Sequence, residues 1–597
     1  MTLPPPAVLP SLLACALLLP VAALRANTYT DGQDDTATYD TSGLEDGLIL
    51  SIEEGTATQS GILSGDGYVA KEGAGTIILS GANTHTGNNV VYGGTLVVAH
   101  NSALGNPPYA SAATAVGSGS TIRIQSGIVL SQGIGIEYQA TLENLGTINA
   151  QLGMVSSTGG KLVNTGTIDA NFGDAVHVQT GLGSITNTGG TLQGSGGVAS
   201  MGIYLRDGGT IRNEAGGLIK STGHDAINGG ELFSGSLSAN TVTVENFGAS
   251  TISGDNYGVN LYSGGSITNS GGSIIEGLQG GGIYISGGEG IVENLGTSTI
   301  SGLQHGVVLE NGGSVTNEGT ITGNQETGPD HAGILFIGSA ASLVNKGTIN
   351  GGVEMDNEAH SATLHAGSRI NGNLNMGTNS AATLTLDGST GTTTFSTTVT
   401  GTTTFQGTLV KQGSGTWALD LGLGSVTSTQ VNEGTLLVNG TLGGDVFVNE
   451  GGTLGGSGPI AGDVLVADGG FLAPGNSPGQ LQIGGGLTLG NGSTVLVDLS
   501  SISLFDQLVV GGVLAFDGAL EISLLNGYRP AVDDEFSLFD AATFASGTSF
   551  DSISFDVDGY EATLDYETGT LTITSVPEPA LTLLFAFGLG TLAIRRR

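Results

Sequence analysis

Residues 314–323 read SVTNEGTITG, and this phrase and its variants occur nine times between residues 142 and 351. In each variant, apolar and polar residues alternate up to an Asn, a Gly follows soon after, and the alternation then resumes. Asn tolerates a left-handed backbone and Gly adopts one without steric cost, so the middle of the phrase predicts a tight turn. The alternation on either side predicts two short β-strands, with side chains such as Val315 pointing inward.

The repeated Asn sets the size of the repeating unit. Successive copies lie 20 to 33 residues apart, which is typical of coils with loops of varying length. If every coil places this Asn at the same corner, the side-chain amides can hydrogen-bond from coil to coil. The alternative is that they are favoured turn residues with no such ladder. The nine positions are Asn144, Asn164, Asn187, Asn213, Asn246, Asn269, Asn294, Asn317 and Asn345.

The composition favours repetitive β structure. Glycine accounts for 107 of the 597 residues, charged residues for 11%, and the mean hydropathy is +0.18. Such a chain is too apolar to be disordered, and its glycine content suits a succession of turns, so we expect an all-β fold. The formal net charge of −38 repels phosphates, so we expect no nucleic acid partner.

Two stretches that flank the Asn repeats share another pattern. Residues 71–105 read KEGAGTIILSGANTHTGNNVVYGGTLVVAHNSALG, and a second copy begins at residue 411 with KQGSGTWALD and continues through VNEGTLLVNGTLGG. Both stretches resemble the autotransporter-associated β-strand repeat. The resemblance implies a right-handed parallel β-helix (β-solenoid) like an autotransporter passenger. The family's translocator barrel is not expected, because too few residues follow the last coil.

The two ends of the chain differ from its body. The apolar run from residue 8 to residue 23 and the small residues after it predict a signal peptide that is cleaved near Ala26. An alternative is that Cys15 lies in a lipobox and is lipidated. At the other end, residues 576–597 read VPEPALTLLFAFGLGTLAIRRR, a stiff proline hinge followed by an apolar run and basic residues.

This C-terminal stretch resembles the PEP-CTERM sorting signal of Gram-negative envelope proteins. The resemblance implies an exosortase-type processing enzyme as a partner and a short transmembrane sorting helix that contacts the inner membrane transiently. An ordinary, permanent C-terminal anchor is the alternative. The residues of the expected sorting motif are Val576, Pro577, Glu578, Pro579, Arg595, Arg596 and Arg597.

These patterns divide the chain into segments. The phenylalanines of the segment before the tail would cover an open coil end, so we expect that segment to be a β cap. The expected segments are a signal peptide (1–26), an N-terminal β-helix with the autotransporter-associated repeat (27–130), the Asn-repeat β-helix (131–360), a second autotransporter-like β-helix (361–500), the β cap (501–575) and the sorting or anchor signal (576–597).

The sequence therefore predicts an exported, non-catalytic protein of the cell envelope, cell surface or extracellular matrix of a Gram-negative bacterium. It would serve display, adhesion or biofilm matrix, with exopolysaccharide or other matrix as a partner. The alternative is a carbohydrate-active enzyme on the same fold, with Asp169 and Asp174, or Asp207 beside Arg206 and Arg212, as its carboxylates. The eight histidines are scattered, so we expect no metal site and no cofactor.

Overall fold

The structure is a computed structural model that describes residues 25–44, 47–108, 113–137, 139–150, 155–157, 159–230, 240–324, 331–388, 394–396 and 398–577. The predicted signal peptide lies outside these residues except for Arg25 and Ala26, and the predicted sorting helix lies outside them from Glu578 onward. Within the described residues, no helix has the length and apolar character needed to cross a membrane. The chain forms two compact units, residues 1–280 and 281–597, which we describe one at a time.

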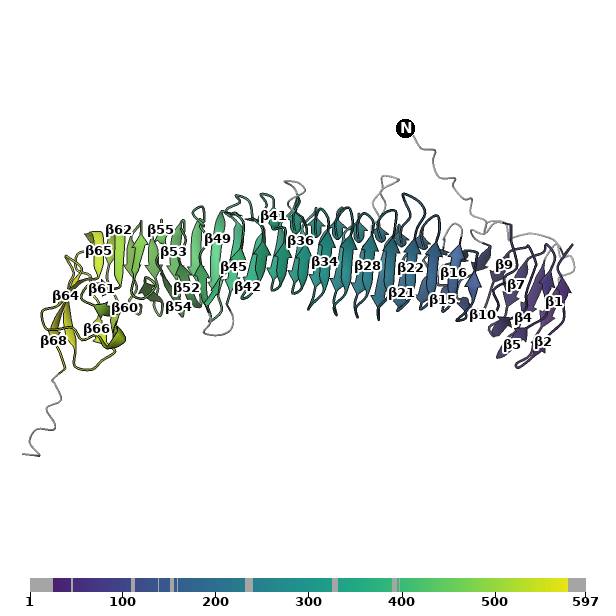
Figure 1. The fold of residues 1–597 in the computed structure, drawn as a ribbon, viewed down its shortest axis with the longest axis horizontal. Coiled ribbons are helices and arrows are strands. Elements are labelled where there is room, and N and C mark those ends of the chain that lie inside the picture. Colours follow the sequence, from purple (N-terminus) through teal and green to yellow (C-terminus); the bar gives the residue numbers. More distant parts are fainter. Residues whose placement is uncertain are drawn as a thin grey trace, which may run out of the picture. The chain divides into compact units, whose positions relative to one another are not determined.

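In the first unit, strands of successive coils pair in parallel and form three sheets that run along the stack (Figure 1). The first sheet contains β1 (Arg25–Thr28), β4 (Leu48–Ser51), β7 (Val69–Glu72), β9 (Asn89–Val91), β11 (Thr114–Val116), β14 (Ile134–Ile136), β17 (Val155–Ser157), β20 (Val176–Val178), β23 (Ile203–Leu205), β26 (Ile227–Gly229) and β29 (Val259–Leu261).

The second sheet of this unit contains β2 (Asp34–Asp35), β5 (Thr56–Gln59), β8 (Thr76–Leu79), β10 (Thr95–Val98), β12 (Thr121–Ile124), β15 (Thr141–Asn144), β18 (Lys161–Asn164), β21 (Gly183–Thr188), β24 (Gly209–Glu214), β27 (Val242–Asn246) and β30 (Gly265–Asn269). The third contains β13 (Val129–Leu130), β16 (Thr147–Ala150), β19 (Thr167–Ala170), β22 (Thr191–Gly194), β25 (Leu218–Ser221), β28 (Thr251–Gly254) and β31 (Ile274–Gly277). β3 (Tyr39–Asp40) and β6 (Leu63–Ser64) pair separately.

The second unit repeats this arrangement. Its first sheet contains β32 (Ile283–Ile285), β35 (Val307–Leu309), β38 (Ile334–Phe336), β41 (Val353–Met355), β44 (Leu374–Asn375) and β48 (Thr403–Thr404). Its second sheet contains β33 (Gly290–Asn294), β36 (Gly313–Asn317), β39 (Ala341–Asn345), β42 (Ser361–His365), β45 (Ala382–Asp387), β49 (Gly407–Gln412), β51 (Ser428–Val431), β53 (Asp445–Val448), β55 (Pro459–Ile460), β56 (Val464–Val466), β58 (Gln480–Ile483), β59 (Leu487–Leu489), β62 (Gln507–Ala515) and β65 (Phe539–Phe544).

Two further sheets follow the second sheet in the coils of this unit. The earlier one contains β34 (Thr299–Gly302), β37 (Thr320–Thr322), β40 (Thr348–Asn350), β43 (Arg369–Asn371) and β47 (Thr398–Val399). The later one contains β46 (Thr394–Ser396), β50 (Thr416–Leu419), β52 (Gly434–Val438), β54 (Gly452–Gly456), β57 (Phe471–Pro474), β60 (Thr494–Ser501), β63 (Ala519–Leu524) and β66 (Ser552–Phe555), and β61 (Leu504–Phe505) pairs with β60.

Equivalent apolar side chains stack on one another inside the coils. Leu142 pairs with Leu162 in the second sheet of the first unit, and these side chains are 0% and 1% exposed. Ile148 pairs with Ile168 in the third sheet, and both are 1% exposed. Parallel strands lie about 4.8 Å apart, so each buried side chain packs directly against its equivalents in the coils on either side. This architecture confirms the predicted all-β parallel β-solenoid.

The segment expected to form a cap begins as a continuation of the coils. β63 pairs in parallel with β60, and β65 pairs in parallel with β62. β64 (Glu535–Ser537), β67 (Glu561–Asp565) and β68 (Thr570–Ser575) form a separate antiparallel sheet, and η2 (Leu525–Gly527) is a short 3-10 helix. The ring of Phe505 lies 5.4 Å from that of Phe536, and the ring of Phe516 lies 5.2 Å from that of Phe539. The boundary at residue 501 and the capping role stay predictions.

Candidate functional site

The repeated Asn side chains lie at one corner of the coils, where the chain passes from the second sheet to the third. All nine are fully buried. In the first unit, the Nδ2 atom of each Asn from Asn144 to Asn246 donates to the Oδ1 atom of the Asn in the next coil. These bonds join Asn144 to Asn164 (2.8 Å), Asn164 to Asn187 (2.7 Å), Asn187 to Asn213 (2.8 Å), Asn213 to Asn246 (2.9 Å) and Asn246 to Asn269 (2.9 Å).

A second row of the same kind lies in the second unit. Asn294 donates to Asn317, and Asn317 donates to Asn345, at 2.9 Å in both cases. The Nδ2 atom of Asn317 also reaches the backbone carbonyl oxygen of Thr348 at 3.2 Å. In the next coil, Leu364 takes the position opposite Asn345, and the row ends. We call the two rows the Asn ladders.

Lys71 satisfies the carbonyl groups of a corner in another way. Its Nζ atom donates to the backbone carbonyl oxygens of Glu72, Gly73 and Gly93, so the ammonium group joins its own turn to the turn of the next coil. The residue is 1% exposed. This burial lowers the pKa of Lys71 to about 8.

Lys411 repeats this arrangement in the second unit. Its Nζ atom donates to the carbonyl oxygens of Gln412 (2.8 Å), Gly413 (2.6 Å) and Glu433 (2.9 Å). The residue is fully buried, and burial lowers its pKa to about 8 as well. The sequence did not predict either lysine contact. The one signal that could have found them is that each lysine precedes an equivalent turn, KEGAGT in one case and KQGSGT in the other.

The aspartates considered for an enzyme make contacts that hold loops in place. Asp174 accepts from the backbone N–H of Met201 at 2.8 Å through one oxygen. Its other oxygen lies 2.7 Å from Nδ1 of His177. Asp207 accepts from the backbone N–H of Gly181 at 2.9 Å. Over the part of the chain that the structure describes, no three His, Cys, Asp or Glu residues gather closely enough to hold a metal ion.

Arg212, one of the two arginines considered beside Asp207, is engaged elsewhere. Arg212 forms ion pairs with Glu214 at 2.8 Å and Glu245 at 2.7 Å, and its guanidinium lies 4.2 Å from the ring centre of Phe247. Asp169 lies on β19, and its Oδ1 atom is buried without a hydrogen-bond partner. Arg212 is therefore paired with two glutamates and not with the aspartates considered for an enzyme.

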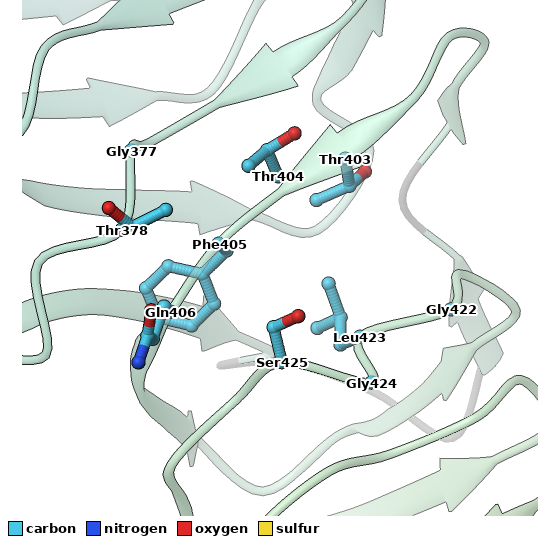
Figure 2. A pocket seen from close by; sticks show the side chains of 10 residues that line it. All are labelled: Gly377, Thr378, Thr403, Thr404, Phe405, Gln406, Gly422, Leu423, Gly424 and Ser425. Atoms are coloured by element: carbon cyan, nitrogen blue, oxygen red, sulfur yellow. The ribbon is translucent and has the colours of Figure 1, made fainter.

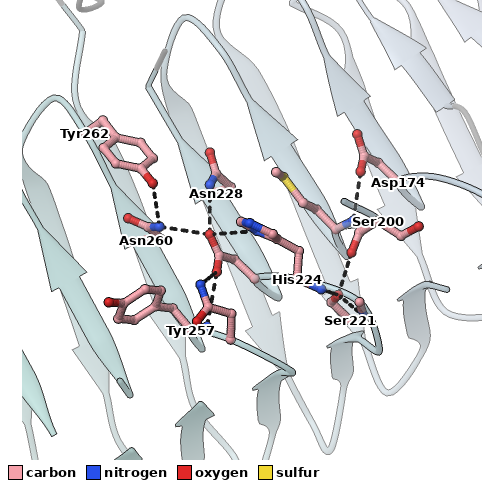
Figure 3. A network of polar contacts seen from close by, with 12 residues as sticks. Asp174, Ser200, Ser221, His224, Asn228, Tyr257, Asn260 and Tyr262 are labelled. Atoms are coloured by element: carbon pink, nitrogen blue, oxygen red, sulfur yellow. Dashed lines mark hydrogen bonds and ion pairs between the residues drawn. The ribbon is translucent and has the colours of Figure 1, made fainter. Parts of the chain in front are cut away.

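A polar network that the sequence did not predict includes His224, Asn228 and Asn260, which Figure 3 labels, and all three lie against the carboxylate of Asp225. The Asp225 side chain is fully buried. One oxygen accepts from Nδ2 of Asn228 and Nδ2 of Asn260, both at 2.9 Å, and lies 3.2 Å from Nδ1 of His224. The other oxygen accepts from the backbone N–H of Tyr257 at 3.1 Å. The network thus connects groups from successive coils of the first unit.

The charge of Asp225 is stabilised by these contacts. Burial alone would raise the pKa of the Asp225 carboxyl, but hydrogen bonds from His224, Asn228 and Asn260 hold that pKa below its usual range. The adjacent Asp225 carboxylate in turn raises the pKa of His224. Both oxygens of the carboxylate have partners within the protein, so the arrangement suits a structural connection better than proton transfer to a substrate.

A small cavity of about 190 Å³ lies between coils of the second unit (Figure 2). Its lining includes the hydroxyl groups of Thr378, Thr403 and Thr404 and the amide of Gln406. The ring of Phe405 also lines it but is only 2% exposed. None of the lining residues is charged, so the cavity can offer hydrogen bonds but no acid or base.

Of the expected sorting motif, the described residues include Val576 and Pro577 alone. Pro577 lies so close to Gly559 that a Cβ atom on this glycine would meet the proline ring at 3.2 Å. The other residues of the motif, Glu578, Pro579, Arg595, Arg596 and Arg597, lie outside the described residues.

A comparison with protein families matches the two stretches that contain Lys71 and Lys411. The family model described as Passenger-associated-transport-repeat matches residues 69–98 and 409–438, and Lys71 and Lys411 occupy the same place in the two matches. A stretch of 153 residues, 25% of this chain, is 29% identical to the adhesin BmaC autotransporter of Brucella suis biovar 1 (strain 1330). The match spans 4% of that protein. The chain thus carries passenger-associated repeats on a parallel β-solenoid and is similar, over a quarter of its length, to part of an autotransporter adhesin.

Proposed function

We propose that this chain is an exported, non-catalytic surface protein whose β-solenoid displays binding surfaces for adhesion or for building an extracellular matrix. The observation that carries this proposal is the pair of passenger-associated repeats on coils whose buried polar side chains bond to neighbouring coils. A solenoid stabilised coil by coil offers extended sheet faces and loops to partners. The similarity to part of an autotransporter adhesin supports the same function.

We further propose how the chain reaches its destination. The segment 1–26 would direct export, and the segment 576–597 would be recognised by an exosortase-type enzyme after transient contact with the inner membrane. If the tail is not cleaved, it would remain as a permanent anchor. Residues 501–575 would cap the last coil, and the solenoid would be right-handed, as parallel strand connections usually are. Exopolysaccharide is the matrix partner that we propose.

The test compares the full chain with a variant that ends after Ser575, both expressed in a Gram-negative host with an exosortase system. We expect protease added to intact cells to cleave the full chain. The shorter chain should keep the same β-rich circular dichroism spectrum and unfolding midpoint. It should appear in a different cell fraction from the full chain. A full chain that stays protected inside intact cells would overturn surface display. A shorter chain that unfolds would show that the tail belongs to the fold.

The same strains test the non-catalytic proposal. Cell adhesion and matrix retention should decline gradually as coils are deleted from residues 142–351, because contacts on a solenoid are distributed over many coils. Asp174→Asn and Asp207→Asn should leave cell adhesion and matrix retention unchanged. Release of reducing sugar or unsaturated uronide from acidic polysaccharides, abolished by either substitution, would establish an enzyme instead.

A further inference from the structure

A groove of about 590 Å³ lies on the outer face of the second sheet in the second unit. The side chains of Phe447, Leu465 and Val513 line it and are 39%, 40% and 51% exposed. Phe447 pairs with Leu465, and Leu465 pairs with Thr488, so these residues form one outward row across three coils. An exposed apolar row of this kind, set in a hollow, is typical of a binding surface.

The hollow arises from an irregular strand. β62 pairs with both β58 and β59, so it runs across a corner at which the preceding coil turns. Its pairing with β65 on the other side shifts register between Val510 and Val513. Gly485, Gly486 and Gly512 line the groove and leave its floor without side chains. A Cβ atom on Gly485 would lie within 2.3 Å of Oδ1 of Asp463, so a larger residue cannot replace this glycine without moving the rim.

Two carboxylates form an acidic rim beside the apolar row. Asp445 accepts from the backbone N–H of Asp463 at 2.9 Å, and Asp463 accepts from the backbone N–H of Gly486 at 2.7 Å. Each bond uses Oδ1 only, and both residues are exposed, so each carboxylate is held in position and can still attract a cation. None of the residues lining the groove is Lys or Arg.

We propose that this groove binds an extended segment of a partner protein in which basic and apolar residues alternate. The apolar side chains would lie on Phe447 and Leu465, and the basic side chains would reach Asp445 and Asp463. An extended segment places successive side chains on opposite sides, which matches an apolar row with a charged rim. Charge complementarity selects a cationic partner, since the chain carries a net charge of −38. This site deepens the proposed function and rests on it, because an exported chain would meet such partners outside the cell.

The test measures binding to the purified full chain by fluorescence anisotropy, with a labelled short peptide of alternating lysine and valine as the probe. The double variant Asp445→Asn, Asp463→Asn keeps the oxygen atoms that accept the backbone N–H groups but removes the charges. We expect it to weaken binding about tenfold and to remove most of its salt dependence. Phe447→Ala should weaken binding about fivefold through lost apolar contact.

Matched controls come from the same unit. Asp468→Asn removes a carboxylate that accepts from the backbone N–H of Gly492 at 3.2 Å in the same manner but does not line the groove. Ile502→Ala removes a side chain that is 50% exposed and also lies outside the groove. Both controls should bind the peptide as the wild type does. Unfolding midpoints of all variants verify that the coils are intact.

Three results would overturn the proposal. One is that a peptide of alternating glutamate and valine binds as well as the lysine peptide, or that neither binds. Another is that Asp468→Asn weakens binding as much as the double variant. The third is that a neutral oligosaccharide binds instead, independently of salt and of the two aspartates, which would make the groove a sugar site. Because the assay uses purified protein, none of these results alters the outcome of the surface-display experiment.

Discussion

In the second unit, Asn317 and Lys411 take the same position of the second sheet, several coils apart. The register passes from Asn317 to Asn345, and then through Leu364 and Leu386 to Lys411. Both the Asn and the Lys are fully buried, and both donate to a backbone carbonyl group at this corner of the next coil. At this position of the solenoid, two different kinds of side chain thus donate hydrogen bonds to the backbone carbonyl groups of the corner.

The difference between the two side chains explains how often each occurs. An Asn amide carries donors and an acceptor, so each Asn can satisfy its neighbour and the row can continue from coil to coil. A lysine carries donors only and a charge, so a second lysine stacked on it would repel it and offer no acceptor. Accordingly, Lys411 lies between Leu386 and Val431. Loss of an Asn should therefore disturb three coils, and loss of the lysine should disturb two.

The largest effect is expected for Asn317→Leu. Leucine has a similar volume, but Oδ1 of Asn345 and the carbonyl oxygen of Thr348 would lose Nδ2 of Asn317 as their donor. Nδ2 of Asn294 would lose its bond to Asn317 and keep only weaker bonds to backbone carbonyl groups. Buried polar groups without partners cost about 1 to 3 kcal/mol each, so we expect the free energy of unfolding to fall by about 3 kcal/mol. Urea denaturation followed by circular dichroism measures the change.

An exposed Asn pair supplies the control for this experiment. Nδ2 of Asn371 donates to Oδ1 of Asn350 at 2.7 Å, in the same coil-to-coil geometry but on the outer surface. Asn371→Ala should change the free energy of unfolding by less than about 0.5 kcal/mol, because water replaces the lost partner. Equal effects of the two substitutions would contradict the importance of burial in the ladder.

Lys411→Met should have the next largest effect. Methionine fills nearly the same space, but the carbonyl groups of Gln412, Gly413 and Glu433 would lose their donor. Removal of a buried charge offsets part of this loss, so we expect a decrease of about 2 kcal/mol in the free energy of unfolding. An unchanged or higher urea midpoint would show that burying the ammonium group costs as much as its three bonds contribute.

Asn345→Leu should cost less, about 1 kcal/mol, because Asn345 ends the ladder. The position opposite it in the next coil is already Leu364, so no side-chain amide there would lose a donor, and Asn317 would keep its bond to the carbonyl oxygen of Thr348. Urea denaturation beside Asn317→Leu measures the difference between an end and an interior position. If the free energy of unfolding falls equally in both variants, an Asn with two Asn neighbours contributes no more to stability than an Asn with one.

The sequence predicted the coils because their turns repeat. Asn and Gly recur at a period that turn chemistry explains, and the alternation beside them predicted which side chains point inward, as for Val315, which is fully buried. Loops of variable length did not hide this pattern, since the phrases around each Asn remain recognisable. The parallel pairing and the stacking of apolar residues followed from the same observation.

The lysines, the Asp225 network and the groove were not predicted, because each depends on contacts between coils. An isolated Lys or Asp in a sequence is usually exposed, and nothing near Lys411 indicates that the next coil covers it. The groove depends on β62 running across a corner, and the Gly-Gly pair in that strand reads as an ordinary turn. The period of the sequence predicts the strands and turns of one coil. It does not predict which residues of the neighbouring coils contact each side chain.

The titration of Lys411 separates the lysine corner from the Asn corner. Burial lowers the pKa of Lys411 to about 8, whereas a lysine in the unfolded chain titrates near pH 10.4. Between about pH 8 and pH 10 the unfolded state binds more protons than the native state, so this lysine makes the free energy of unfolding rise with pH. Below about pH 8 both states are protonated, and its contribution is constant. The Asn ladder has no titratable group and contributes no slope.

The urea midpoint of the wild type, measured from pH 7 to pH 10, should therefore rise relative to that of Lys411→Met. The midpoint of Asn317→Leu should remain parallel to that of the wild type over the same range. Lys71 has a similarly lowered pKa and remains in every variant, so Lys411→Met should remove only part of the slope. Parallel curves for the wild type and Lys411→Met would mean that three carbonyl groups hold the ammonium proton as tightly as water does. The desolvation of Lys411 would then be fully offset by its hydrogen bonds, and the lysine corner would resemble the Asn corner in energy as well as in position.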